Sequence, residues 1–236
     1  MADLNEAAVR QGLPAHLRER ARLLPARPRA ALQGDAGEAQ KFVLYWMRSA
    51  LRGHENPALD AAIWAGNAWK LPVLVLLHVE DDYPYATARR QMFILQGAQG
   101  AQAELQRRGV QTVVQVDRTA GSRGARLGGA SRYAPVLELA RSAALVVAEE
   151  PFCVPWLAGV EALQEGGLSA PTWLLDCCSV VPCALVSPGV CHRAYAFENG
   201  TKELHRARIS WAWEDVRADA AGLEPVDLLA EPLLRR

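Results

Sequence analysis

The stretch at residues 42–59, FVLYWMRSALRGHENPAL, decides the fold of this chain. Its first five residues form a continuous apolar run, which is typical of a strand covered on both faces. Asn56 is a favoured helix N-cap, and Pro57 suits the first helical position. The stretch therefore predicts a buried strand, an arginine-bearing loop and a capped helix. In an open α/β sheet such a loop lies at the carboxyl end of a strand, where ligands bind.

Strand and helix patterns continue to alternate along the chain. We expect four further strands, at residues 72–78, 111–116, 144–148 and 172–176. We expect helices at residues 57–66, 85–108, 135–141 and 154–164. This alternation predicts an α/β fold, a Rossmann-like three-layer sandwich with a five-stranded parallel sheet.

The chain divides into three regions. Residues 1–40 are an arginine- and alanine-rich lead-in, expected to be partly flexible, with a short helix at 17–24. Residues 41–210 hold the α/β domain, in which the glycine- and arginine-rich segment 118–132 is expected to be a surface loop. Residues 211–236 are interpreted as a C-terminal tail or as the start of a further, helical domain.

Composition limits the classes of partner and compartment. The 236 residues are half hydrophobic and carry a formal net charge of zero, so no global charge favours nucleic acid or an anionic membrane. No apolar run is long enough to span a bilayer. An odd count of five cysteines argues against a disulfide scaffold and predicts an intracellular, reducing compartment: cytoplasm, nucleus or an organelle. Their spacing is irregular, so we expect buried, unreactive thiols and no metal site.

Several motifs resemble the photolyase/cryptochrome family, whose members open with a hydrophobic strand, an arginine-x-aspartate-leucine-arginine loop and asparagine-proline-alanine-leucine. Here the loop reads RSALR at 48–52, with Ala50 in place of the aspartate, and NPAL follows at 56–59. EEPF at 149–152 resembles the family's acidic turn after strand four, and VVPC at 180–183 resembles the class II cyclobutane-dimer photolyases. The resemblance covers about residues 41–210, although residues 195–209 depart from the class II pattern.

The resemblance implies the N-terminal α/β domain of that family, which can house a light-harvesting antenna chromophore, a deazaflavin or a folate. In the family, FAD and the DNA lesion bind a helical C-terminal domain, which we expect to be missing because the chain ends at Arg236. FAD would then require a separate helical domain as partner. The chain is thus expected to bind an antenna chromophore or assist light-driven DNA repair.

The family relation is to deoxyribodipyrimidine photolyase, a lyase, but we expect no DNA repair and no direct DNA binding by the chain alone, and no membrane partner. The alternative is a nucleotide-binding or protein-interaction module without photochemistry, since the same sheet topology serves nucleotide proteins.

Seven residues are predicted to line a cofactor site at the carboxyl ends of the first, second and fourth strands. They are Arg48, Leu51, Arg52, His54, Arg89, Glu149 and Phe152. Arginine suits anionic ligands because its planar, permanently charged group carries a fork of donors. A carboxylate at this edge could accept hydrogen bonds from ribose or ribityl hydroxyls. The competing interpretations are a solvated loop for the arginines and helix capping for the glutamate.

The remaining motifs predict structural roles. No nucleophile motif or phosphate-binding glycine loop is present, so no catalytic residue is predicted. Trp46, Trp173 and Phe93 are expected in the core. Trp211 and Trp213, which follow the last strand, are expected to cover an exposed edge.

Overall fold

The computed structural model describes residues 5–25, 41–79, 87–116, 133–219 and 223–227. The loop predicted at 118–132 lies outside these ranges, as do residues 26–40 of the lead-in and most of the tail beyond residue 219. The proposed boundaries at residues 40 and 210 stay predictions.

The centre of the fold is a six-stranded sheet in the order β1-β6-β5-β2-β3-β4. The five predicted strands are all present and parallel, which confirms the α/β sandwich; they are β2 (Phe42–Met47), β3 (Val73–Val79), β4 (Gln111–Val116), β5 (Ala143–Glu149) and β6 (Thr172–Leu175).

The sixth strand corrects the prediction of a helix at 17–24. A short helix, α2 (Ala15–Arg18), is followed by β1 (Ala21–Leu24), which pairs antiparallel with β6. The backbone of Ala21–Leu24 thereby satisfies the open edge of β6, which would otherwise present unpaired N–H and C=O groups. Tertiary pairing at this edge overrides the local helical pattern.

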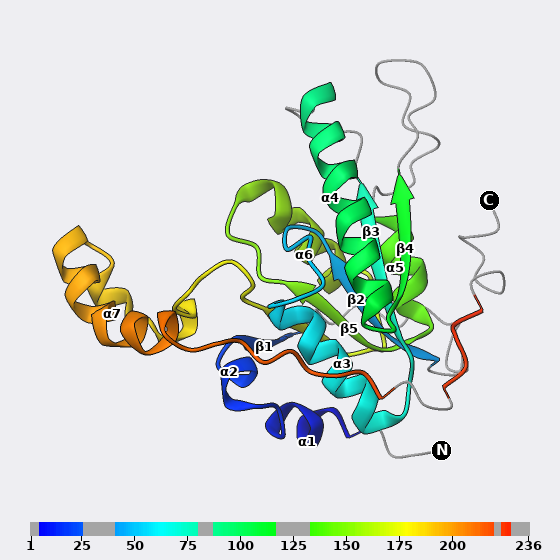
Figure 1. Ribbon diagram of the computed structural model, residues 1–236, viewed down its shortest axis with the longest axis horizontal. Coiled ribbons are helices and arrows are strands. Elements are labelled where there is room, and N and C mark those ends of the chain that lie inside the picture. Colours follow the sequence, from blue (N-terminus) through cyan, green and yellow to red (C-terminus); the bar gives the residue numbers. More distant parts are fainter. Residues whose placement is uncertain (1–4, 26–40, 80–86, 117–132, 220–222, 228–236) are drawn as a thin grey trace.

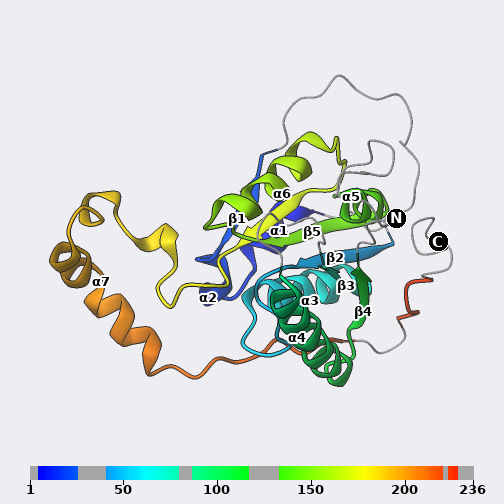
Figure 2. The same ribbon diagram turned by 90° about the horizontal axis from the view of Figure 1, so that it is seen from above.

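Two helical layers cover the sheet (Figures 1 and 2). The pair α3 (Pro57–Trp69) and α4 (Ala88–Arg107) covers one face, and the pair α5 (Ala134–Arg141) and α6 (Val154–Glu165) covers the other. In β2, Val43, Tyr45 and Met47 enter the core beneath α3, while the alternate residues Phe42, Leu44 and Trp46 enter the core beneath α5 and α6. Trp46 and Trp173 are fully buried, as predicted.

The strand order places a topological switch point at the centre of the sheet. After β2 the chain continues through α3 to β3 on one side, whereas β5 pairs with β2 on the other side. The loops that leave β2 and β5 therefore diverge at their carboxyl ends. In doubly wound folds this divergence marks the ligand-binding crevice.

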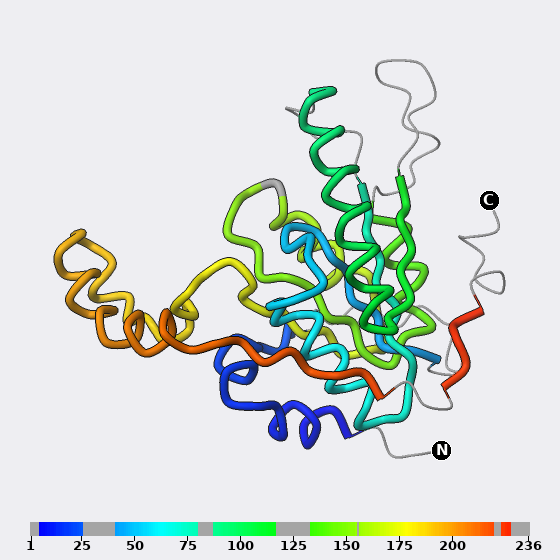
Figure 3. Tube along the Cα trace, in the orientation of Figure 1, coloured from blue at the N-terminus to red at the C-terminus, as the bar shows by residue number. Residues whose placement is uncertain are grey.

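The C-terminal part of the described chain leaves the sandwich and returns. After β6 the chain forms two short 3-10 turns, Cys183–Leu185 and Pro188–Val190, and then α7 (Ala194–Ile209), which stands off the body in Figures 1 and 2. Residues 211–219, here called the strap, then run back past α2 and along α3 (Figure 3). The N-terminal helix α1 (Glu6–Gln11) packs on the same side.

Within the described ranges, no helix combines the length and apolarity needed to cross a bilayer.

Candidate functional site

Glu149 lies at the switch point, where β5 ends beside the loop that follows β2. Its carboxylate accepts hydrogen bonds from three successive backbone N–H groups, those of Arg48 (3.2 Å), Ser49 (2.7 Å) and Ala50 (3.1 Å). The Ser49 hydroxyl also donates to it. Successive N–H groups of this kind form an anion-binding nest. The carboxylate thus occupies the place where many doubly wound proteins hold a ligand phosphate.

Two buried polar side chains, Tyr45 and Asn56, hold the Glu149 carboxylate in this nest. The hydroxyl of Tyr45 donates to Glu149 at 2.8 Å, and the amide of Asn56 donates to that hydroxyl at 3.2 Å. Asn56 also caps α3 by accepting from the backbone N–H of Ala58 and Leu59. Burial and the neighbouring carboxylate raise the pKa of Tyr45 well above its usual value, so the phenol stays a neutral donor.

Arg48 lies on the α6 side of the loop. Its guanidinium stacks over Trp46, 4.4 Å from the ring centroid, and its Nη1 donates to the carbonyl of Trp156 at 3.0 Å. Gly159 of α6 leaves room for this side chain, because a Cβ there would lie 2.6 Å from Nη1. Packing therefore holds the Arg48 charge in a defined place near the switch point.

The rest of the arginine loop contacts α4 on one side and the loop after β6 on the other. Arg52 donates to the carbonyls of Glu55 (3.0 Å) and Cys177 (3.3 Å), while His54 lies 3.1 Å from Glu104 on α4. Leu51 packs partly buried against the core on this side. The loop thus brings its three predicted residues to the same sheet edge as Arg48 and Glu149.

Two predicted site residues lie at the margins. Arg89 is exposed in the first turn of α4, and Phe152, just beyond β5, is 48% exposed. The prediction that Phe93 belongs to the core is wrong, since it is 74% exposed. Phe93 lies on the half of α4 near Arg89, where the described residues bury little of the helix. The cofactor-binding role of all seven predicted residues stays a prediction.

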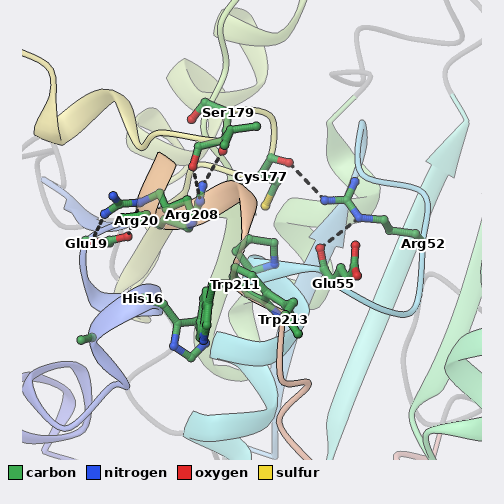
Figure 4. Close-up of a pocket in the computed structure, with 15 residues that line it drawn as sticks. His16, Glu19, Arg20, Arg52, Glu55, Cys177, Ser179, Arg208, Trp211 and Trp213 are labelled. Atoms are coloured by element: carbon green, nitrogen blue, oxygen red, sulfur yellow. Dashed lines mark hydrogen bonds and ion pairs between the residues drawn. The ribbon is translucent and has the colours of Figure 1, made fainter. Parts of the chain in front are cut away.

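A cavity of about 610 Å³ opens beside this edge and was not predicted. It lies between α2, the arginine loop, the loop after β6 and the start of the strap (Figure 4). Of the seven predicted residues, only Arg52 lines it; His16, Arg20, Trp211 and Trp213 supply much of its wall. We call it the tryptophan cavity. The two tryptophans were a usable sequence signal, but their position after the last strand suggested only an edge cover.

The cysteines correct another prediction. Only Cys177, directly beyond β6, is buried, and burial raises its pKa well above the usual value. The other four thiols are exposed, because the chain has left the sandwich or lies on a helix end there; they are Cys153, Cys178, Cys183 and Cys191. In the part of the chain that the structure describes, no three His, Cys, Asp or Glu side chains are grouped to hold a metal ion.

The solved structures that resemble this chain include two universal stress proteins. One is from Archaeoglobus fulgidus, solved in complex with dAMP; it is 13% identical, with a TM-score of 0.38, over 59% of this chain and 100% of the other. The second, from Burkholderia pseudomallei, is 19% identical, with a TM-score of 0.32, over 59% of this chain and 98% of the other. Neither likeness is high enough to bear on ligand or function.

Comparison with known sequences gives stronger evidence of relationship than these two structures do. Residues 43–131 match the family described as DNA photolyase. A deoxyribodipyrimidine photo-lyase from Methanothermobacter thermautotrophicus is 28% identical over 185 residues, which are 78% of this chain and 38% of that protein. The match therefore spans well under half of the relative's length. With a parallel α/β sandwich and the motifs of the arginine loop, these matches show that the chain is similar to the DNA photolyase family within its α/β region.

Proposed function

We propose that this chain binds an antenna chromophore, a deazaflavin or a folate, and serves light-driven DNA repair together with a helical FAD-binding domain. The observation that supports this most is where the photolyase match begins. It starts at Val43 and so includes β2 and the arginine loop, which form the β2 side of the switch point. In doubly wound sheets this is the edge that receives ligands.

The chemistry of the edge suits a planar, anionic chromophore. Arg48, Arg52 and His54 offer cationic or donor groups within one loop, and Arg48 is already fixed by its stacking on Trp46. Leu51 and Phe152 would supply apolar walls. Glu149 would contribute by holding the loop, since most of its acceptor capacity is taken up by the nest and Tyr45.

The filled nest favours a chromophore over a nucleotide. A nucleotide in a doubly wound fold places its phosphate on the N–H groups that follow the first strand. In this chain the Glu149 carboxylate holds those groups, so a phosphate would have to displace a buried, multiply bonded anion. The nucleotide-binding alternative therefore has less support.

Exposed apolar side chains support a protein partner. Met92 and Phe93 on α4 and Tyr195 on α7 are each more than half exposed. Apolar groups of this size commonly mark interaction surfaces when they gather on one element. A helical FAD-binding domain, in the same or another polypeptide, would fit such surfaces and would supply the flavin chemistry. A protein-interaction role without any chromophore is the second candidate.

The absorbance spectrum of the protein purified from its source tests the proposal. A bound deazaflavin or folate absorbs in the near-UV or blue, well separated from the protein band. We expect such a band to co-elute with the protein in gel filtration. A spectrum with only the protein band, together with no uptake of either chromophore in reconstitution, would contradict chromophore binding and leave the interaction role.

A further inference from the structure

The tryptophan cavity has an ordered aromatic wall. The imidazole of His16 meets Trp211 and Trp213 edge-on, with ring centroids 4.9 and 4.8 Å apart (Figure 4). Trp213 is further fixed because its indole N–H donates to Asp60 at 2.7 Å. Trp211 remains 44% exposed. The wall therefore places the accessible indole of Trp211 beside the edge-on pair of His16 and Trp213.

The positive charge in the cavity lining comes from arginines that donate hydrogen bonds to backbone carbonyls. Arg20 donates to the carbonyls of Ser179 (2.7 Å), Val180 (3.0 Å) and Asp176 (3.2 Å). Arg52 likewise donates only to carbonyls in its two hydrogen bonds described above. Carbonyl acceptors orient a guanidinium without cancelling its charge. Both arginines thus keep a positive charge at the cavity.

Arg208, the third arginine that lines the cavity, is neutralised by an ion pair. Arg208 forms a two-pronged pair with the carboxylate of Glu19, at 2.7 and 3.2 Å. Glu55 is the other carboxylate among the lining residues, so three arginines face two glutamates and one positive charge is in excess. Burial lowers the pKa of His16, which keeps its imidazole neutral near neutral pH. Counted over the lining side chains, the arginine side of the cavity therefore favours an anion, whereas the carboxylates of Asp60 and Glu214 act on His16 at the aromatic side.

Two buried polar atoms in this lining are also unused. Within the described parts of the chain, neither Nε of Arg20 nor Nε2 of His16 has a hydrogen-bond partner. Buried polar atoms of native proteins nearly always find one, in the protein, in water or in a ligand. Both atoms belong to residues that line the tryptophan cavity, on its arginine side and on its aromatic side.

We propose that the tryptophan cavity is a binding site for a planar aromatic anion, with its ring on Trp211 and its anionic group toward Arg20 and Arg52. The volume of about 610 Å³ lies in the usual range for small-molecule sites, roughly 300–1,000 Å³. Stacking on an indole suits any flat ring, and guanidinium groups suit phosphate or carboxylate. This site shares Arg52 with the loop at the switch point, where we place the antenna chromophore, but includes neither Arg48 nor Glu149 and does not depend on that proposal.

Two pairs of probes test the anion and identify the ring. FMN is compared with riboflavin, and AMP with adenosine, by titration calorimetry and tryptophan fluorescence. We expect the phosphate-bearing member of at least one pair to bind about tenfold or more tightly than its neutral partner. The pair that binds more tightly distinguishes a flavin-like ring from a purine.

Variants locate the bound probe. Trp211→Ala should weaken binding by about tenfold, since it removes the aromatic side chain on which the ring of the probe stacks. Tyr195→Ala removes an exposed aromatic residue of α7 that does not line the cavity, so it should bind as the wild type does. Arg48→Ala should also bind the probe normally, because Arg48 belongs to the switch point.

A second substitution does not depend on removing a large side chain. Ala207 is an exposed residue of α7 that lines the cavity, so Ala207→Glu adds a negative charge there with little risk to the fold. It should weaken binding of the phosphate probe several-fold, whereas Ala207→Gln should not. The inference is overturned if no phosphate probe binds saturably, if its neutral partner binds equally well, or if Ala207→Glu has no effect. It is also overturned if Arg48→Ala abolishes binding while Trp211→Ala does not.

Discussion

Removing Arg108 should release the strap from α3 and destabilise the fold. Its Nη2 donates to the fully buried carboxylate of Asp60 at 2.7 Å and to the carbonyl of Val216 at 2.5 Å. The same carboxylate accepts from the indole of Trp213 and from the backbone N–H of Val216. Asp60 is therefore the anchor of the strap, and Arg108 supplies the charge that balances it.

The expected loss of unfolding free energy for Arg108→Ala follows from the Asp60 carboxylate, which would stay buried without its partner. Removing one partner of a buried ion pair typically costs ~3–5 kcal/mol. The Arg108 side chain is 15% exposed, so water can partly replace it, and we expect the lower end, about 3 kcal/mol, for Arg108→Ala. Trp213→Phe removes one hydrogen bond to a charged group and should cost less, about 1.5–3 kcal/mol.

The loss should also depend on pH. Burial raises the pKa of Asp60 above its ordinary 3.8, while the hydrogen bonds from Arg108 and Trp213 oppose this rise. Removing Arg108 should raise the pKa further. A carboxyl whose folded-state pKa is raised contributes stability below its unfolded pKa and loses it as pH rises through the folded value. Arg108→Ala should thus be most destabilising near neutrality and less so toward pH 4.

Urea unfolding followed by tryptophan fluorescence and far-UV circular dichroism measures these effects. Lys70→Ala is the matched control, because it removes another strap contact, the exposed pair with Asp219 at 2.9 Å. Exposed pairs contribute ~0–1 kcal/mol, so little change is expected. If Arg108→Ala lost no more stability than Lys70→Ala, or lost more at pH 4 than at pH 7, the anchor interpretation would be refuted.

Three further predictions concern the switch point and activity. Glu149→Gln should cost about 1.5–3 kcal/mol of unfolding free energy, because an amide cannot accept from the nest on both of its terminal atoms, and urea titration measures it. Gly159→Ala should cost about 1–3 kcal/mol, since its Cβ would lie 2.6 Å from Arg48 and 2.8 Å from Trp46; Gly100→Ala, which has open space on α4, serves as the comparison. The purified chain, without a flavin-binding partner, should not repair a dimer-containing oligonucleotide under light; repair without that partner would contradict this.

The parallel core was predictable because its signals are local. The run at Phe42–Met47 is buried along its whole length, and the Asn56 cap forms as its sequence predicts. When apolar strands alternate with amphipathic helices, few topologies are possible. The five strands and their parallel direction could therefore be predicted. The placement of Glu149 at the carboxyl edge also followed, since β2 and β5 are parallel neighbours.

Features set by distant contacts were missed. The antiparallel strand Ala21–Leu24 exists because β6 has an open edge about 150 residues away in the sequence, which no local pattern reveals. The nest around Glu149 requires knowing that this carboxylate meets the loop after β2. The tryptophan cavity needs His16, the arginine loop and the strap together, three segments separated along the chain. Phe93 was misplaced because helical spacing alone cannot show which face a helix leaves uncovered.

Titration of the wild type and Arg48→Ala with deazaflavin and folate tests the central claim most directly. Arg206→Ala, on the exposed side of α7 and paired only with Glu203 in its described ion pair, is the matched arginine control. We predict that the wild type and this control bind one chromophore with equal affinity. Arg48→Ala should bind it more weakly by about 1.5–3 kcal/mol, the loss of a charge-assisted hydrogen bond. Binding of neither chromophore by the wild type, or equal binding by all three proteins, would contradict the proposed site at the switch point.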